Sequence, residues 1–200
     1  MKVKTNLVVD YEDRFIWLDG HITSSVASRF VKMLAKLNRL ECSPIIFYIK
    51  GPGGNPYPTF WMMSEIEASA SPVAIVAHEY VNSACFTITQ AGVHRLALKG
   101  TRFSFHPVEF DISNDRKVIR MTQKELMGVL DSLRLIDAMQ LLWFLKRSRP
   151  VKKVMRLFIE DSTIGLSKAR KLKIIDDYYE ESDFLKDKRR AMKLIKTQTS

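Results

Sequence analysis

The sequence predicts an α/β fold with a mostly parallel sheet and an added helical region. Three observations lead to this prediction. Short apolar runs alternate with segments of helical spacing through the first half of the chain. Two runs, Pro44–Ile49 and Val73–Ala77, are apolar at nearly every position, which is typical of strands buried on both faces. The second half is helix-rich from about residue 117. Strands joined by helices of this length favour right-handed crossovers in one sheet.

Five strands are expected in the first half, each followed by residues that favour a turn or a break. They are Arg14–Leu18, Pro44–Ile49, Val73–Ala77, His94–Leu98 and Arg102–His106. Three helices are expected between them. The first begins at Ser24 or Ser25, whose hydroxyl suits a helix cap. The second covers Thr59–Ala70, and the third, Asn82–Ala91, ends before Gly92.

The second half is expected to hold helices and a basic tail. Met, Leu and Ile recur at helical spacing over Lys117–Arg147, which predicts a long helical handle that breaks before Pro150. Two short helices, an extended piece and the tail follow at Val151–Ile159, Ser167–Leu172, Lys173–Asp177 and Ser182–Ser200. We therefore expect one domain over residues 1–181, with the handle at about 117–147, and a partly helical basic tail over 182–200.

Composition excludes several classes of protein. With 46% apolar and 27% charged residues, the chain is neither disordered nor collagen-like. No run approaches the roughly 18 apolar residues that span a bilayer, and no signal peptide is recognisable. Cys42 and Cys85 are too few for a disulfide framework or a cysteine zinc site, so we expect reduced thiols in the cytoplasm. No metal-spaced cluster of ligands stands out, and we expect neither metal nor cofactor.

The net charge of +10 makes nucleic acid the first partner to consider. However, no stacking aromatics interleave with the basic residues, and no zinc, RRM-like or helix-turn-helix signature occurs. Many of the positive charges lie at 146–156, 168–173 and 186–196, beyond the predicted strands of the first half. Nucleic acid binding is therefore disfavoured, and the charge is assigned to a solvated face or to an acidic partner surface.

Two short motifs follow the two most apolar strands. Gly53-Gly54 would let backbone N–H groups converge on a phosphate or an oxyanion, although an ordinary turn is the commoner meaning of a glycine pair. Ser83 lies at a predicted strand-to-helix turn, where its hydroxyl would be held out from the chain as a nucleophile. The simpler alternative is that Ser83 or Asn82 only caps the helix.

A histidine and an aspartate could complete a catalytic set. His106 ends a predicted strand, from which it can project into a cleft as a general base or remain an ordinary edge histidine. Asp161 could cap a helix, orient a histidine or be solvated. Judged singly, each residue has a common structural explanation, so their order along the chain matters more.

Together these segments resemble the Clp protease proteolytic subunit family, the ClpP-like serine peptidases, from about Arg14 to Tyr178. The family pattern YINSPGG reads YIKGPGG here, from Tyr48 to Gly54. The segment EYVNSACFTITQAG is similar to the family's nucleophile segment and puts Ser83 on the nucleophile. The segment RFSFHPV is similar to the family's histidine segment and puts His106 on the catalytic histidine. DSTIGLSKARKLKIID resembles the family's segment between two aspartates and puts Asp161 on the triad acid.

The resemblance implies a ClpP/crotonase-like fold of repeated β-β-α units and a serine endopeptidase. Ser83 would attack the scissile carbonyl, His106 would take its proton, and Asp161 would orient the imidazole. The backbone N–H groups at Gly53, Gly54 and Ala84 would form the oxyanion hole. The resemblance also implies a homo-oligomeric ring that encloses the sites, in which the handle joins two rings and peptides or unfolded or partner proteins are cleaved.

Departures from the family pattern leave alternatives open. Glu79 stands where the family has a glycine, and VEFDISNDRKV lacks the glycine of the family's peptide-binding strand. Only about a dozen residues precede the first predicted strand, where the family has the loops that meet an AAA+ ATPase ring, so an ATPase partner stays open. A catalytically silent subunit of a mixed ring and, with less support, a crotonase-like acyl-CoA enzyme are the alternative functions.

Overall fold

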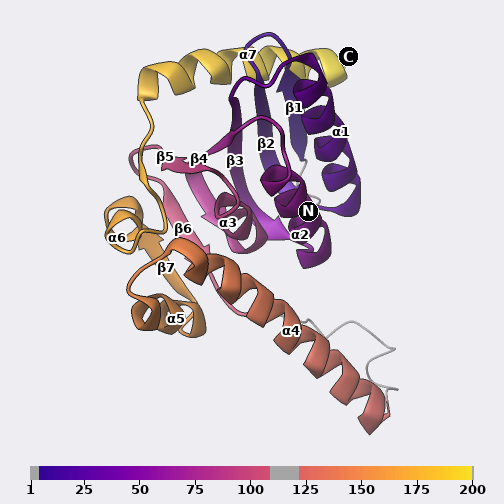
Figure 1. The fold of residues 1–200 in the computed structure, drawn as a ribbon, viewed down its shortest axis with the longest axis vertical. Helices are drawn as coiled ribbons and strands as arrows, with labels where there is room; N and C mark the ends of the chain where they lie inside the picture. Colours follow the sequence, from indigo (N-terminus) through magenta and orange to yellow (C-terminus); the bar gives the residue numbers. More distant parts are fainter. Residues whose placement is uncertain (1–4, 109–121, 200) are drawn as a thin grey trace.

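The computed structural model describes residues 5–108 and 122–199, which fold around one sheet of eight strands (Figure 1). Six strands lie in the order β1-β2-β3-β4-β5-β8, while β6 pairs with the C-terminal end of β4 and with β7. Their bounds are β1 Asn6–Asp10, β2 Phe15–Ile22, β3 Ile45–Gly54, β4 Val73–Asn82, β5 His94–Ala97, β6 Arg102–Phe105, β7 Ser162–Gly165 and β8 Asp177–Tyr178. Of the strand pairs in the described residues, only β1–β2 and β6–β7 are antiparallel, so the sheet is mostly parallel, as predicted.

Several strands differ from their predicted bounds. β2, β3 and β4 continue past their apolar runs into polar or glycine-rich ends. The prediction of an extended piece over Lys173–Asp177 is wrong except at its last residue, because residues 172–175 make turns and bends before β8. β1 and β7 are absent from the predicted order. Their short sequences acquire strand structure by pairing with β2 and β6.

Three helices cover one face of the sheet: α1 Ser24–Leu40, α2 Pro56–Glu67 and α3 Ser83–Thr89 (Figure 1). Thr23 caps α1 in place of the predicted serine, since its Oγ1 accepts the Val26 N–H at 3.2 Å. The second helix starts three residues before its predicted start because Asn55 caps it and Pro56 suits a first helical turn. The main core lies between these helices and the sheet.

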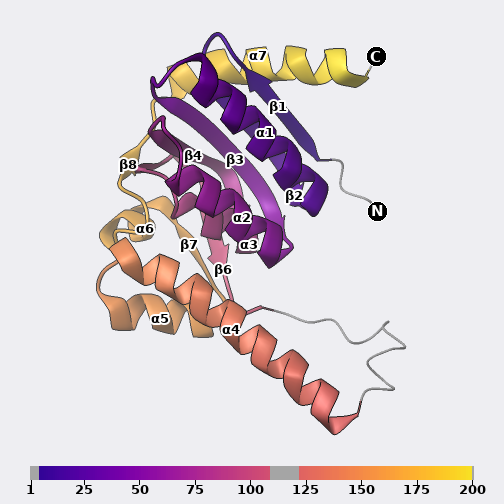
Figure 2. The same cartoon turned by 45° about the vertical axis from the view of Figure 1, so that its right-hand side comes forward.

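Helix α7, Glu181–Thr199, packs on the opposite face of the sheet (Figures 1 and 2). The sequence predicts a partly helical basic tail over 182–200, whereas the structure shows a helix that contributes to a second apolar cluster. Phe184 of α7 stacks on Trp17 with ring centroids 5.4 Å apart, and it also meets Tyr48. The sheet is thus covered by helices on both faces.

The remaining helices are α4 Gln123–Arg147, α5 Val151–Ile159 and α6 Leu166–Lys171. Figure 1 shows α4 extending away from the sheet, and its first half is largely exposed. Its buried residues are Ile136, Gln140 and Phe144, all in its second half. The predicted handle thus corresponds to α4, although its predicted first residues fall within 109–121, outside the described part. Among the described residues, no helix is long and apolar enough to cross a membrane.

Candidate active site

The glycines at the end of β3 bring its backbone unusually close to its neighbours. Gly53 has φ +108°, and a Cβ there would lie 2.7 Å from Ser83 Cβ and 2.9 Å from the Ala84 nitrogen. At Gly54, φ is +151°, and a Cβ would lie 2.2 Å from the Ile22 carbonyl oxygen. Only glycine fits such positions without displacement of the backbone. The predicted glycine turn therefore lies directly beside the predicted nucleophile.

Ser83 stands at the junction of β4 and α3 in a strained conformation. Its φ is +50°, a left-handed value that residues with a Cβ rarely adopt. Asn82 occupies the cap position of α3, but its side chain makes no capping hydrogen bond. The capping explanation therefore does not account for this turn. A strained serine at a strand-to-helix turn is the backbone arrangement that holds a nucleophilic hydroxyl clear of the chain.

Cys85, two residues further on, is a poor alternative nucleophile. Its side chain is fully buried, and burial raises the pKa of its thiol to about 12, a rise partly offset by a hydrogen bond from the Gly53 backbone. A thiol must ionise to attack, so at neutral pH this cysteine is inert. Ser83 is only half-buried and lines a cavity. The comparison favours the serine as the reactive group of this segment.

A cavity of about 300 Å³ brings several predicted residues together. Ser83 and His106 both line it, together with Gly54 and Ala84, two of the predicted oxyanion donors. His106 Nδ1 lies 2.7 Å from the Pro107 carbonyl oxygen. Because a carbonyl oxygen can only accept, this bond places the proton of the neutral ring on Nδ1 and the lone pair on Nε2. That tautomer is the one a general base facing a serine requires.

Asp161 lies directly before β7 and outside the cavity. In the antiparallel β6–β7 pair, Phe105 is opposite Ser162, so His106 and Asp161 each stand one residue beyond the paired strands. The Asp161 side chain is exposed, however, and does not line the cavity. Its φ of +48° marks a tight turn between α5 and β7. The cavity therefore unites the predicted serine and histidine, while the predicted aspartate lies outside it, at the turn before β7.

Helix α4 supplies residues that the motif search does not find. Gln140 is buried and lines the cavity, and Asp137 accepts the Val108 N–H at 2.7 Å, next to the Pro107 carbonyl that holds His106. Gln140 lies four residues from Ile136 and four from Phe144, in the middle of the buried stripe of α4. A polar residue in such an apolar stripe is the signal that could have pointed to it.

Glu79 stands where the resembled family has a glycine, and its backbone explains that preference. Its φ is +55°, again left-handed. Its carboxylate lies 3.1 Å from Lys50 Nζ and 3.8 Å from Lys188 Nζ. Burial disfavours its charge, but the hydrogen bond from Lys50 outweighs that effect and lowers the pKa of Glu79. Glu79 in place of a glycine thus keeps the left-handed backbone conformation and adds ion pairs with Lys50 and Lys188.

No potential metal centre emerges in the described part of the chain, where no three His, Cys, Asp or Glu side chains form a suitable group. A comparison with protein families finds that a model described as Clp protease matches residues 3–177. No curated protein matches. Among solved structures, a ClpP1 mutant from Listeria monocytogenes has a TM-score of 0.67 at 20% sequence identity, over 86% of this chain and 95% of that chain. The two chains share a fold, which agrees with the predicted α/β class.

Proposed function

This chain belongs to the Clp protease family, and from that premise we propose that it is a serine endopeptidase acting on peptides or on unfolded or partner proteins. One observation carries the proposal: a single cavity is lined by the strained Ser83, by His106 and by the backbone of Gly54 and Ala84. These are a nucleophile, a base and oxyanion donors, the groups that acyl transfer to a serine needs.

The proposed reaction begins at the Ser83 hydroxyl. Its Oγ attacks the scissile carbonyl carbon while His106 Nε2 takes the hydroxyl proton. The imidazolium then gives this proton to the leaving amine as the C–N bond breaks, which leaves an acyl-serine. Water, deprotonated by the same nitrogen, hydrolyses the ester and restores the serine. The Pro107 carbonyl supports the Nδ1–H tautomer in the resting site.

The tetrahedral intermediate carries a negative oxygen that needs donors. We assign these to the N–H groups of Gly54 and Ala84, since both residues line the cavity. Gly53 does not line the cavity, and its part is to let Ser83 approach. Loss of one donor of this kind costs about 3 kcal/mol of transition-state stabilisation.

We also propose that the chain works in a homo-oligomeric ring joined through α4. Its first half carries exposed apolar side chains that no described element covers: Leu126, Met127, Leu130 and Leu135. Burying them against another subunit would stabilise an assembly, because each exposed apolar side chain gains up to about 2 kcal/mol on burial. A ring would also restrict access to extended or unfolded chains.

Replacement of the nucleophile tests the proposal. Ser83→Ala is expected to lower the kcat of peptide hydrolysis by on the order of 10⁶-fold, because the attacking oxygen is lost. A fluorophosphonate probe should label the parent protein at Ser83, as located by peptide mass mapping. Ser64→Ala, which removes an exposed serine of α2, is the matched control and should cleave and label like the parent. Equal hydrolysis by Ser83→Ala would disprove the assignment.

The second candidate is a catalytically silent subunit of a mixed ring, and the exposed position of Asp161 favours it. If Asp161 is the triad acid, Asp161→Asn should lower kcat by about 10⁴-fold while fluorophosphonate labelling slows. Asp131→Asn, at an exposed position on α4, is the control. If the parent itself neither cleaves peptides nor reacts with the probe, the silent subunit is the better description.

A further inference from the structure

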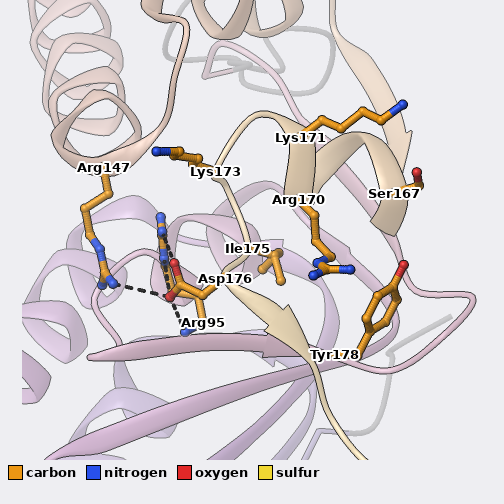
Figure 3. Close-up of a pocket in the computed structure, with 9 residues that line it drawn as sticks. All are labelled: Arg95, Arg147, Ser167, Arg170, Lys171, Lys173, Ile175, Asp176 and Tyr178. Atoms are coloured by element: carbon orange, nitrogen blue, oxygen red, sulfur yellow. Dashed lines mark hydrogen bonds and ion pairs between the residues drawn. The ribbon is translucent and has the colours of Figure 1, made fainter.

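A strongly basic cavity of about 750 Å³ lies away from the candidate active site, and no residue lines both. Figure 3 shows it between the end of α4, helix α6 and strand β8. Five cationic side chains line it against one carboxylate, that of Asp176. The cationic residues are Arg95, Arg147, Arg170, Lys171 and Lys173. Its volume suits a small ligand, but its charge is unlike the mostly apolar lining of common small-molecule pockets.

The single carboxylate is already used by the protein. Arg95, whose side chain is 2% exposed, donates to Asp176 from its backbone N–H and its guanidinium, and Arg147 donates to the same carboxylate at 3.3 Å. Burial opposes ionisation of Asp176, but the Arg95 hydrogen bonds prevail and lower its pKa. Dashed lines in Figure 3 join Asp176 to both arginines. Asp176 therefore cannot also neutralise the lysines.

The lysines of this cavity lack partners. Neither Lys171 nor Lys173 forms an ion pair or a side-chain hydrogen bond within the part of the chain that the structure describes. Arg170 is satisfied by Asp177 at 3.0 Å and lies 4.4 Å from the centre of the Tyr178 ring. Like charges gathered in a concave site repel one another, and a bound anion would relieve that repulsion.

The positive lining continues into a neighbouring cavity of about 690 Å³, which shares Ser167, Lys171 and Tyr178 with the first. This second cavity adds three more lysines and no carboxylate: Lys99, Lys153 and Lys168. Lys171 therefore stands at the junction of two basic hollows. An anion that extends through both would meet cationic groups along its whole length.

We propose that the two joined cavities, here called the basic trough, bind a small ligand that carries a chain of phosphate groups. Phosphate is favoured because it concentrates more negative charge per volume than a carboxylate and accepts from lysine and from serine hydroxyls such as Ser167. A chain of phosphates could meet cationic groups of both cavities, which a single phosphate could not. The proposal is independent of the peptidase assignment, since no residue of the trough lines the candidate active site.

Inorganic tripolyphosphate is the probe, titrated into the full chain by calorimetry at constant ionic strength. We expect saturable binding that is at least tenfold tighter than that of monophosphate. Lys171→Ala/Lys173→Ala should weaken it at least tenfold. Lys186→Ala/Lys193→Ala, which removes the same charge from exposed positions on α7, should change it less than twofold. Circular dichroism would establish that both variants fold.

Three results would overturn the proposal. Equal weakening by both double variants would mean that net charge alone attracts the probe. Absence of saturation would mean that no site exists. Tighter binding of hexaglutamate or of a single-stranded oligonucleotide with matched charge would assign the trough to an acidic peptide or to a nucleic acid. Lys171→Arg/Lys173→Arg keeps both positive charges, so an affinity like that of the parent would support the need for cations at these positions.

Discussion

At the residue scale, two of the strained backbone positions carry candidate catalytic residues. Among described residues, five besides glycine have left-handed φ values, and Ser83 and Asp161 are two of them. The other three are Arg14, Glu79 and Lys173. Each such position costs of order 1–3 kcal/mol and persists only where surrounding contacts hold it. At Ser83, this contact is with Gly53, whose lack of a Cβ leaves room for the serine side chain.

Gly53→Ala tests that contact. The added methyl would lie 2.7 Å from Ser83 Cβ, so we expect Ser83 to shift, peptide hydrolysis to fall at least 10²-fold and stability to drop by about 3 kcal/mol. Gly100→Ala is the matched control, because Gly100 also has a positive φ, +86°, but open space around its Cβ position. Its cost should stay near 1 kcal/mol, with activity intact. Urea unfolding and steady-state kinetics measure both effects. Similar behaviour of the two variants would contradict the packing argument.

The sequence can single out Ser83 and His106, since each follows a predicted strand and the two stand in motifs that resemble the family in order. The position of Asp161 depends on the register between β6 and β7, which are more than 50 residues apart in the chain. Gln140 and Asp137 reach the site only because α4 returns beside it. The sequence therefore finds the proposed nucleophile and the proposed base, while the rest of the cavity wall depends on long-range packing.

At the element scale, α4 presents an apolar surface without a partner in the described chain. Leu130→Glu puts a charge in this surface, and we expect it to shift the protein from an assembly toward the monomer while its circular dichroism stays unchanged. Leu40→Glu, which replaces an exposed leucine at the end of α1, is the control and should leave assembly intact. Light scattering during size-exclusion chromatography measures both. A monomeric parent, or identical sizes for the parent and Leu130→Glu, would refute the assignment of α4 to assembly.

The elements that sequence reasoning describes least well are those that depend on partners. β7 is only four residues long and becomes a strand by pairing with β6. Helix α7 is rich in charge, which hides the helical spacing of Phe184, Ala191 and Ile195 that meets the sheet. Long apolar strands and α5, by contrast, carry their own signal, and α5 has its predicted bounds.

At the scale of the whole molecule, the free energy of unfolding should decrease as pH falls, because of His78. This side chain is fully buried against Trp17 and Phe184, and burial lowers its pKa to about 3 from 6.5. As pH falls below 6.5, the unfolded chain binds a proton that the folded chain does not, so stability falls by up to about 1.4 kcal/mol per pH unit.

His78→Phe removes the imidazole that causes this loss of stability in acid, and it keeps an aromatic ring in the cluster. Urea unfolding between pH 4.5 and 6.5 should show a shallower loss of stability for this variant than for the parent. His94→Phe, at an exposed position on β5, should follow the parent. Parallel curves for all three proteins would show that His78 does not govern acid sensitivity.

The position of α7 also bears on how the chain acquires its fold during synthesis. Residues 181–199 leave the ribosome after every strand of the sheet, yet they alone bring Phe184 and Ala191 to the face that holds Trp17 and Tyr48. A nascent chain can therefore pair its strands while this aromatic face is still open to water. Exposed surfaces of that kind are where growing chains associate wrongly or engage chaperones. Completion of α7 closes that interval, so a helix made after the sheet protects strands made before it.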